Sequence, residues 1–116
     1  MSKYIPRQGD IVKINFSTLQ EGEDNPQKSA VVLSRDEYND RMGFVIVSPI
    51  NQTIRSQPYY YTLDGYKTHG QICTHLMHSL DYSEKTNRDI EYVETLSYLD
   101  MLQVMQLVDY NFKSKI

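Results

Sequence analysis

The chain has 116 residues, of which 40% are hydrophobic, and this suffices for one domain with a single core. A formal net charge of −3 excludes a protein that traps nucleic acid by overall charge, so any such binding needs a local basic patch. The single cysteine, Cys73, excludes an intramolecular disulfide and fits a reducing compartment. No signal peptide and no run of roughly 18 apolar residues is present, so we expect a cytoplasmic protein that does not enter membranes.

An alternating segment and a long polar loop open the chain. Residues 10–16 alternate between apolar and polar side chains, which predicts a half-buried strand with Lys13 and Asn15 on its polar face. Residues 17–29 show no hydrophobic periodicity, and loops longer than about 12 residues are usually functional or disordered. Four candidate chemical groups lie in this loop: Glu21, Glu23, Asp24 and Lys28.

Two apolar runs follow the loop and indicate buried strands. Residues 30–34 and 44–50 are rich in Val and Ile and are bounded by turn-forming residues. Between them, Asp36 is expected to cap one helical turn that ends at Gly43. Because Pro49 cannot donate a ladder hydrogen bond, the later strand should lie at a sheet edge or end at this residue.

The second half of the chain predicts further strands and one helix. The expected elements are strands over residues 59–63, 70–77 and 89–94, with a polar loop over 79–88. Ser97 and Asp100 resemble a capping box, and the apolar stripe after them has helical spacing: Met101, Val104, Met105 and Val108. Five or six short strands and a C-terminal helix predict a small, strongly bent sheet or barrel with the helix packed on it, as one domain over 1–116.

Four segments stand in a recognisable order and spacing. They are Gly9-Asp10-Ile11-Val12, Ala30-Val31-Val32-Leu33-Ser34, Val47-Ser48-Pro49-Ile50, and Gly70 through Ser79-Leu80-Asp81. Together they resemble the MazF/PemK family of toxin endoribonucleases. The resemblance implies an SH3-like small barrel of the MazF/PemK (CcdB-like) type, a homodimer and an antitoxin partner. It also implies sequence-selective cleavage of single-stranded mRNA without a metal or another cofactor.

The same resemblance assigns the candidate catalytic positions. The acidic loop residue of the family is matched by Glu23, its catalytic arginine falls on Lys28, and its catalytic threonine falls on Asn51, with Thr53 two residues further. The family's Gln-Val-Lys-Ser becomes Leu76-Met77-His78-Ser79, and His78 is kept as a proton carrier. Expected RNA contacts are Ser17, Gln27, Gln52, Arg55 and Ser79.

Cleavage of RNA without a metal sets the demands on these residues. The ribose 2′-OH attacks the phosphate, a base takes its proton, an acid protonates the leaving 5′-oxygen, and donors stabilise the phosphorane. Lys28 keeps the charge of an arginine but lacks the two-pronged fork that fits a phosphate. We expect Lys28 to contact the scissile phosphate, Asn51 or Thr53 to donate to it, and Glu23 or His78 to move protons. This requires the polar end of the 44–50 strand to face the loop.

Other interpretations of the same residues stay open. Lys28 also fits a solvated lysine, Glu23 an exposed acidic run, and Asn51 a turn former after a strand. His75 and His78, three apart on one predicted strand, should point to opposite faces, so a metal site is not predicted.

Two further functions compete with cleavage. The residues at four family positions depart from the pattern and favour a weakened or silent member that binds an antitoxin or nucleic acid without cutting: Lys28, Ser29, Asn51 and Leu76. The third hypothesis is topoisomerase inhibition, as in CcdB-like toxins, which share the barrel and lack the loop cation.

Overall fold

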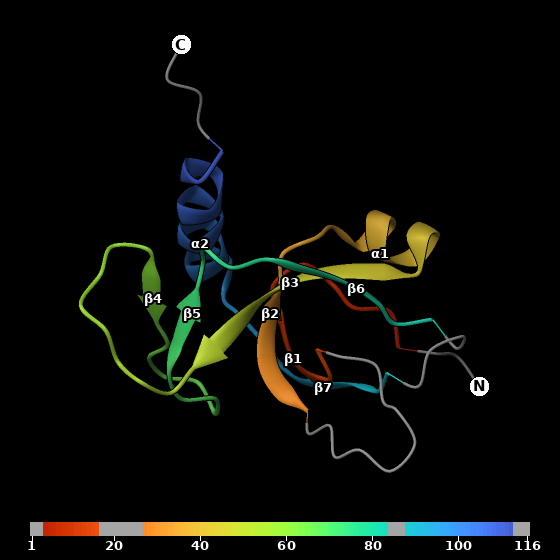
Figure 1. Cartoon of the computed structure of the whole chain (residues 1–116), viewed down its shortest axis with the longest axis horizontal. Coiled ribbons are helices and arrows are strands. Elements are labelled where there is room, and N and C mark those ends of the chain that lie inside the picture. The colour runs from red at the N-terminus through yellow and green to blue at the C-terminus, as the bar shows by residue number, and fades with distance from the viewer. Residues whose placement is uncertain (1–3, 17–26, 84–87, 113–116) are drawn as a thin grey trace.

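The computed structural model describes residues 4–16, 27–83 and 88–112. Its elements, in chain order, are β1 (Asp10–Ile14), β2 (Lys28–Val32), α1 (Asp36–Met42), β3 (Phe44–Asn51), β4 (Tyr60–Thr62), β5 (Gln71–Cys73), β6 (His78–Asp81), β7 (Ile90–Thr95) and α2 (Tyr98–Tyr110). The antiparallel strands follow the order β4-β5-β3-β2-β1-β7, and β6 pairs with β3 (Figure 1). The fold is therefore mainly β with a C-terminal helix, as predicted, in a bent sheet whose strand order is not closed into a ring. Neither helix in these ranges has the length and apolar character that a membrane crossing demands.

Both faces of the central strands are buried. On β1, Ile11 belongs to the hydrophobic cluster that contains Val104 of α2, whereas Val12 and Ile14 belong to a second cluster on the other face. Adjacent residues of a strand point to opposite faces of the sheet. The sheet bends around the second cluster on one face and packs against α2 on the other, so both faces are buried. The predicted half-buried first strand is wrong in this respect: Asn15 is only 5% exposed, and its side-chain oxygen accepts a hydrogen bond from the Asp89 N–H at 3.1 Å.

The second strand starts earlier than the sequence predicted. β2 begins at Lys28 and ends at Val32, so Lys28 and Ser29 belong to the strand and not to the predicted loop. In the ladder Lys28 is opposite Ile14, the last residue of β1. Pairing with a strand distant in sequence extends β2 over polar residues, and no local periodicity reports such pairing.

The short helix α1 is as predicted at its end but not at its start. Gly43 ends it in the left-handed conformation, with φ of 66°. Arg35 occupies the N-cap position without a side-chain capping bond, and Asp36 is the first helical residue. The Asp36 carboxylate instead accepts a hydrogen bond from the Gln8 N–H at 3.0 Å.

Pro49 lies within β3, and the prediction of an edge or a strand end is wrong. The Ile46 carbonyl accepts from the Leu33 N–H at 2.8 Å, so Ile46 and, two residues on, Ser48 direct their backbone groups towards β2. Pro49 therefore directs its missing N–H to the other side. On that side, β3 pairs with β6 as far as Val47 and with β5 from Ile50 onwards. Neither β5 nor β6 therefore needs a donor from Pro49.

The predicted 70–77 strand is interrupted. β5 ends at Cys73, and β6 covers His78–Asp81, so its last three residues form a strand where the 79–88 loop was predicted. The chain must turn here because β5 and β6 pair with different parts of β3. His75 and His78 thus do not share a strand: the His75 ring packs 4.2 Å from the ring of Tyr59, and the His78 ring packs 4.9 Å from that of Phe16.

The C-terminal helix is anchored at its first turn, and the predicted cap and apolar stripe are confirmed. The Ser97 hydroxyl accepts from the Asp100 N–H at 3.2 Å, and three stripe residues are buried: Met101, Val104 and Val108. The Asp100 carboxylate accepts from the hydroxyls of Tyr61, at 2.5 Å, and of Tyr66. These two hydrogen bonds hold the pKa of Asp100 below its ordinary value. Burial of Tyr61, together with its hydrogen bond to Asp100, raises the pKa of Tyr61 to about 12. α2 is therefore tied to β4 and to the loop beyond it.

Replacing this carboxylate should expose its contribution to stability. We expect Asp100→Asn to lower the free energy of unfolding near pH 7 by about 1.5–3 kcal/mol, because it removes hydrogen bonds to a charged group. A lowered native pKa gives stability that is complete above the unfolded value near 3.9 and is lost as pH falls through the native value. Urea unfolding between about pH 3 and 7 should therefore show a shallower acid decline in the variant. Asp109→Asn, on the exposed side of α2, is the control, and equal losses in both variants would contradict the assignment.

Candidate functional site

A groove of about 950 Å³ lies beside the outer ends of β2 and β3 and the loop that joins β4 to β5. Its volume is at the upper end of the range for ligand pockets. Its polar lining residues are Lys13, Gln27, Lys28, Ser29, Asn51, Gln52, Thr53, Lys67, Thr68 and His69, and its less polar residues are Pro49, Ile50, Cys73, Leu76 and Val93. Three lysines in one groove make a local basic surface on a chain of negative net charge.

Strand register brings Lys28 and Asn51 together. β2 and β3 are antiparallel, and Ala30 is opposite Pro49. Counting two residues outward along each strand places Lys28, the first residue of β2, level with Asn51, the last residue of β3. Both side chains are exposed and line the groove. The two strand ends thus contribute an ammonium and a carboxamide to the same groove, and either group can bind a phosphate oxygen.

The Asn51 side chain is oriented by the turn that follows it. Its Oδ1 accepts a hydrogen bond from the Thr53 N–H at 3.2 Å. Because a backbone N–H can only donate, the atom facing it must be the carbonyl oxygen, and the amide NH₂ is the part that can donate to a ligand. Asn51 therefore presents a hydrogen-bond donor to the groove.

Two residues of β5 and its approach fix the end of β3. Gly70 has φ of 129°, and a Cβ there would lie 2.4 Å from the Asn51 carbonyl oxygen, so only glycine permits this approach. Gln71, 3% exposed, accepts from the Arg55 N–H at 2.8 Å and donates to the Arg55 carbonyl at 3.1 Å and to the Thr62 hydroxyl at 2.9 Å. The segment after Asn51 is thereby hydrogen-bonded to the sheet.

The structure gathers part of the predicted set. Lining the groove are Gln27, Lys28, Asn51, Gln52 and Thr53. Three predicted residues are not among its lining residues: Arg55, His78 and Ser79. Glu23 and Ser17 lie outside the described residues. The catalytic and RNA-binding roles of all these residues stay predictions.

Among the polar lining residues that the sequence did not indicate as site residues are Lys13, Thr68 and His69. Lys13 had a local signal, since it is the polar position of an alternating strand and the one exposed residue of β1. Thr68 and His69 stand in a loop whose position depends on contacts with distant strands, so no local pattern indicates them.

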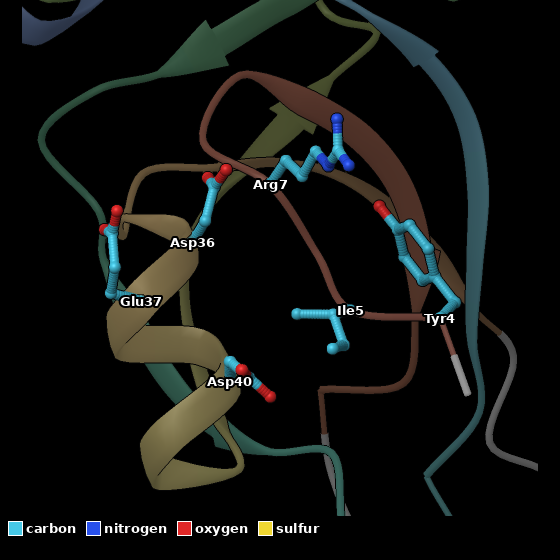
Figure 2. A pocket seen from close by; sticks show the side chains of 6 residues that line it. All are labelled: Tyr4, Ile5, Arg7, Asp36, Glu37 and Asp40. Atoms are coloured by element: carbon cyan, nitrogen blue, oxygen red, sulfur yellow. The ribbon is translucent and has the colours of Figure 1, made fainter. Parts of the chain in front are cut away.

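A second hollow lies between the N-terminal segment and α1. Figure 2 shows Tyr4, Ile5 and Arg7 on one side and the carboxylates of Asp36, Glu37 and Asp40 on the helix. Three carboxylates against one arginine repel a polyanion. This hollow is thus a poor candidate for binding phosphate, and the basic groove is the better one.

Comparison with known proteins agrees with the fold. The model of the family described as PemK-like, MazF-like toxin of type II toxin-antitoxin system matches residues 7–112. Endoribonuclease toxin MazF of Escherichia coli strain K12 and endoribonuclease MazF of Escherichia coli O157:H7 are each 29% identical to the chain over 70 residues. These alignments cover 60% of the chain and 63% of either relative, which is less than two thirds of their length.

Solved structures share the fold at low sequence identity. The crystal structure of MazF (Form-I) from Deinococcus radiodurans has a TM-score of 0.78 at 22% identity, covering 95% of this chain and 98% of that one. A MazE-MazF structure (Form-II) from the same organism has a TM-score of 0.80 at 21% identity, covering 95% and 97%. An endoribonuclease in complex with its cognate antitoxin from a Mycobacterial species has a TM-score of 0.70 at 11% identity, covering 95% of both chains. These likenesses show the fold.

The close approach at Gly70 gives a test of how the groove is built. Gly70→Ala should destabilise the chain more than Gly65→Ala, because both glycines have positive φ but only at Gly70 does the new Cβ meet backbone, at Asn51. We expect about 1–3 kcal/mol for the backbone conformation in either variant and a further loss in Gly70→Ala alone. Chemical unfolding measures both values, and amide hydrogen exchange at Asn51 and Gln52 should accelerate only in Gly70→Ala. Equal stability and equal exchange in the two variants would show that the contact does not fix the end of β3.

Proposed function

The chain belongs to the PemK-like, MazF-like toxin family of type II toxin–antitoxin systems, and on that premise we propose that it is an endoribonuclease that cuts single-stranded mRNA sequence-selectively and without a metal ion. The observation that supports this most directly is that Lys28 and Asn51, at the ends of two neighbouring strands, line one groove together with further lysines. A cation and an amide donor on one phosphate are what phosphoryl transfer needs from a protein that supplies electrostatic stabilisation.

The proposed reaction forms one P–O bond and breaks another. The ribose 2′-oxygen attacks the phosphorus, and a base accepts the proton of the 2′-OH. The bond to the 5′-oxygen breaks, and an acid protonates that oxygen, so the products end in a 2′,3′-cyclic phosphate and a 5′-hydroxyl. Lys28 and the Asn51 amide stabilise the charge on the phosphorane oxygens, with Thr53 beside them. Lys28 acts as a point charge and lacks the geometry of an arginine fork.

The proton carriers are proposed from three side chains. Glu23 and His78 are the residues that the sequence indicates. His69 is the histidine that lines the groove among the described residues. A pH–rate profile of single-turnover cleavage for Glu23→Gln, His69→Gln and His78→Gln identifies the carriers, because losing the base or the acid removes one limb of the profile.

A second candidate function rests on Lys28 and Asn51 themselves. The family resemblance places an arginine at the position of Lys28 and a threonine at the position of Asn51. Weaker stabilisation of the charge on the phosphorane by Lys28 and Asn51 would lower the rate of RNA cleavage. A member that binds RNA or an antitoxin without cutting would keep the groove and lose turnover. Expression in a bacterium separates the candidates: growth arrest with new 5′-hydroxyl RNA ends supports cleavage, arrest with broken DNA supports topoisomerase inhibition, and no arrest supports a binding module.

The partners we propose are a cognate antitoxin and a second copy of the chain. Two of the structures with the same fold are complexes of a MazE with a MazF and of an endoribonuclease with its antitoxin. Support for a homodimer comes from α2, whose outer side exposes large apolar side chains: Tyr98 at 79%, Leu99 at 68%, Leu102 at 45% and Tyr110 at 74%. Exposed apolar patches of this kind mark interaction surfaces.

Cleavage should depend on the cation and the amide donor. We expect Lys28→Ala and Asn51→Ala each to lower kcat by about 10²–10³-fold, the effect of removing one positioned donor. Lys28→Arg should cleave at least as fast as the unchanged chain, because its fork makes two parallel hydrogen bonds to a phosphate. The assay is cleavage of a mixed-sequence oligoribonucleotide in EDTA, with the new ends mapped.

The control is Arg41→Ala, which removes an exposed cation at the end of α1, away from the groove. It should leave the rate unchanged. Unchanged cleavage in both Lys28→Ala and Asn51→Ala would remove this pair from the mechanism, and cleavage that stops in EDTA would contradict the metal-free route.

The outer side of α2 can be tested by charge. We expect the double variant Leu99→Asp, Leu102→Asp to run as a monomer in size-exclusion chromatography with light scattering, at a concentration where the unchanged chain has twice the chain mass. Burying either aspartate in an interface would cost about 2 kcal/mol or more. Met42→Asp, at a site 57% exposed on α1, is the control and should remain dimeric. A dimer of the double variant would place the contact elsewhere.

A further inference from the structure

The strand β7 holds the loop between β4 and β5 through one carboxylate. Glu94 accepts hydrogen bonds from the Lys67 N–H at 3.0 Å, the Thr68 N–H at 2.8 Å and the Thr68 hydroxyl at 2.9 Å. Burial raises the pKa of Glu94, but these hydrogen bonds outweigh burial and bring it below its ordinary value. β4 and β7 stand at opposite ends of the strand order, so a side chain makes the connection that no strand pairing makes.

The other end of the same loop is fixed on β3. Gly70 lies against the Asn51 backbone, and its carbonyl accepts from the Leu63 N–H at 2.9 Å. The hydroxyl of Tyr66 accepts from the Ser97 N–H at 2.9 Å and donates to Asp100, so the loop also contacts the start of α2. A segment held at this many points presents its remaining side chains in a fixed place.

The side chains that the anchoring does not use are an amine and an imidazole, and both line the groove. Lys67 and His69 are exposed, and both line the groove that also contains Lys28. Among the described residues, the ion pair that the structure shows joins Arg35 to Glu37, so neither Lys28 nor Lys67 makes a direct ion pair with a described carboxylate. The Lys67 ammonium acts on Glu94 through its charge, which helps to lower the pKa of that carboxyl, while the Glu94 oxygens accept from backbone and hydroxyl donors. The exposed Lys67 ammonium therefore keeps donors for a ligand.

We propose that residues 67–69 form a second wall of the groove that binds the phosphodiester backbone of single-stranded RNA beside the cleaved phosphate, and that Glu94 is the positioning residue for this wall. The inference rests on the proposed ribonuclease function and adds to it a binding element on a different segment from Lys28 and Asn51. Proteins that bind single strands combine a positive groove along the backbone with further base contacts. A single cation fixes one phosphate, whereas cations on two walls also set the direction of the strand.

Binding of a non-cleavable RNA tests the wall apart from catalysis. The probe is a 2′-O-methyl oligoribonucleotide, measured by fluorescence anisotropy over a range of salt concentrations. We expect Glu94→Gln to raise Kd about 10-fold, because an amide can accept from the loop with only one of its two heavy atoms. Lys67→Gln should reduce the slope of log K against log salt by about 0.7, the value for one phosphate contact on a single strand. Glu37→Gln, an exposed carboxylate on α1, should bind as the unchanged chain does.

Each variant needs a check on the loop itself. Glu94→Gln should accelerate amide exchange at Lys67 and Thr68, and circular dichroism should show that it is folded. Lys67→Gln and His69→Gln alter exposed side chains and leave the anchoring bonds in place, so they test the wall even if Glu94→Gln unfolds. Weaker RNA binding in these two variants, with unchanged melting temperatures, supports the proposal.

The outcomes separate this inference from the proposed function. If cleavage depends on Lys28 while the Glu94 and Lys67 variants bind RNA normally, the wall is wrong and the ribonuclease stands. If the chain does not cleave but these variants weaken RNA binding, the wall stands and the ribonuclease fails. If the unchanged chain does not bind RNA, the proposal that residues 67–69 bind the RNA backbone is wrong. The same holds if the chain binds only an acidic peptide such as poly-glutamate.

Discussion

The change of partner along one side of β3 is the constraint on which the rest of the structure depends. β6 pairs with the first half of the strand and β5 with its last two residues. Pro49 lies between the two ladders, where its missing N–H faces neither. The chain between β5 and β6 has to turn, and the sheet bends at this place. The bend brings the loop beyond β4 to the end of β3, where the groove lies.

The groove combines exposed chemistry with buried support. Lys28 and Asn51 are at the ends of their strands, where side chains reach solvent and ligands. Gln71 and Gly70, next to Asn51, are buried, Gln71 with hydrogen bonds to Arg55 and Gly70 against the Asn51 backbone. Buried polar groups that are fully hydrogen-bonded rigidify a structure, whereas partly satisfied ones weaken it. A phosphate site built on lysine, which lacks the geometry of arginine, depends more on the rigidity of its surroundings, because the strand end must supply the precision that the guanidinium fork would give.

Sequence patterns predicted the parts of this molecule that are locally encoded. The stripe of α2 and its cap at Ser97 follow from helical spacing, and the apolar runs around Val31 and Val45 identify their strands. The extension of β2 to Lys28 depends on Ile14, and the place of Lys67 depends on Glu94, 27 residues further on. Such contacts are decided by topology, and a periodicity of two or 3.6 carries no information about them. The predicted loop cation, Lys28, was therefore found on a strand, and Thr68 and His69 in the same groove were not predicted.

Separation of charge gives the molecule a direction. The chain is acidic overall, yet three lysines line the groove, and three carboxylates of α1 line the hollow at the other end of β3. α1 comes directly before β3, and Asn51 is the last residue of β3. The eight-residue strand therefore separates the acidic hollow from the basic groove by roughly 20 Å. That distance exceeds the Debye length of about 8 Å in physiological salt, so the acidic end does little to weaken the field in the groove. A polyanion that approaches α1 is repelled, and one that approaches the ends of β2 and β3 is attracted. The negative net charge thus restricts the binding of a polyanion to the groove.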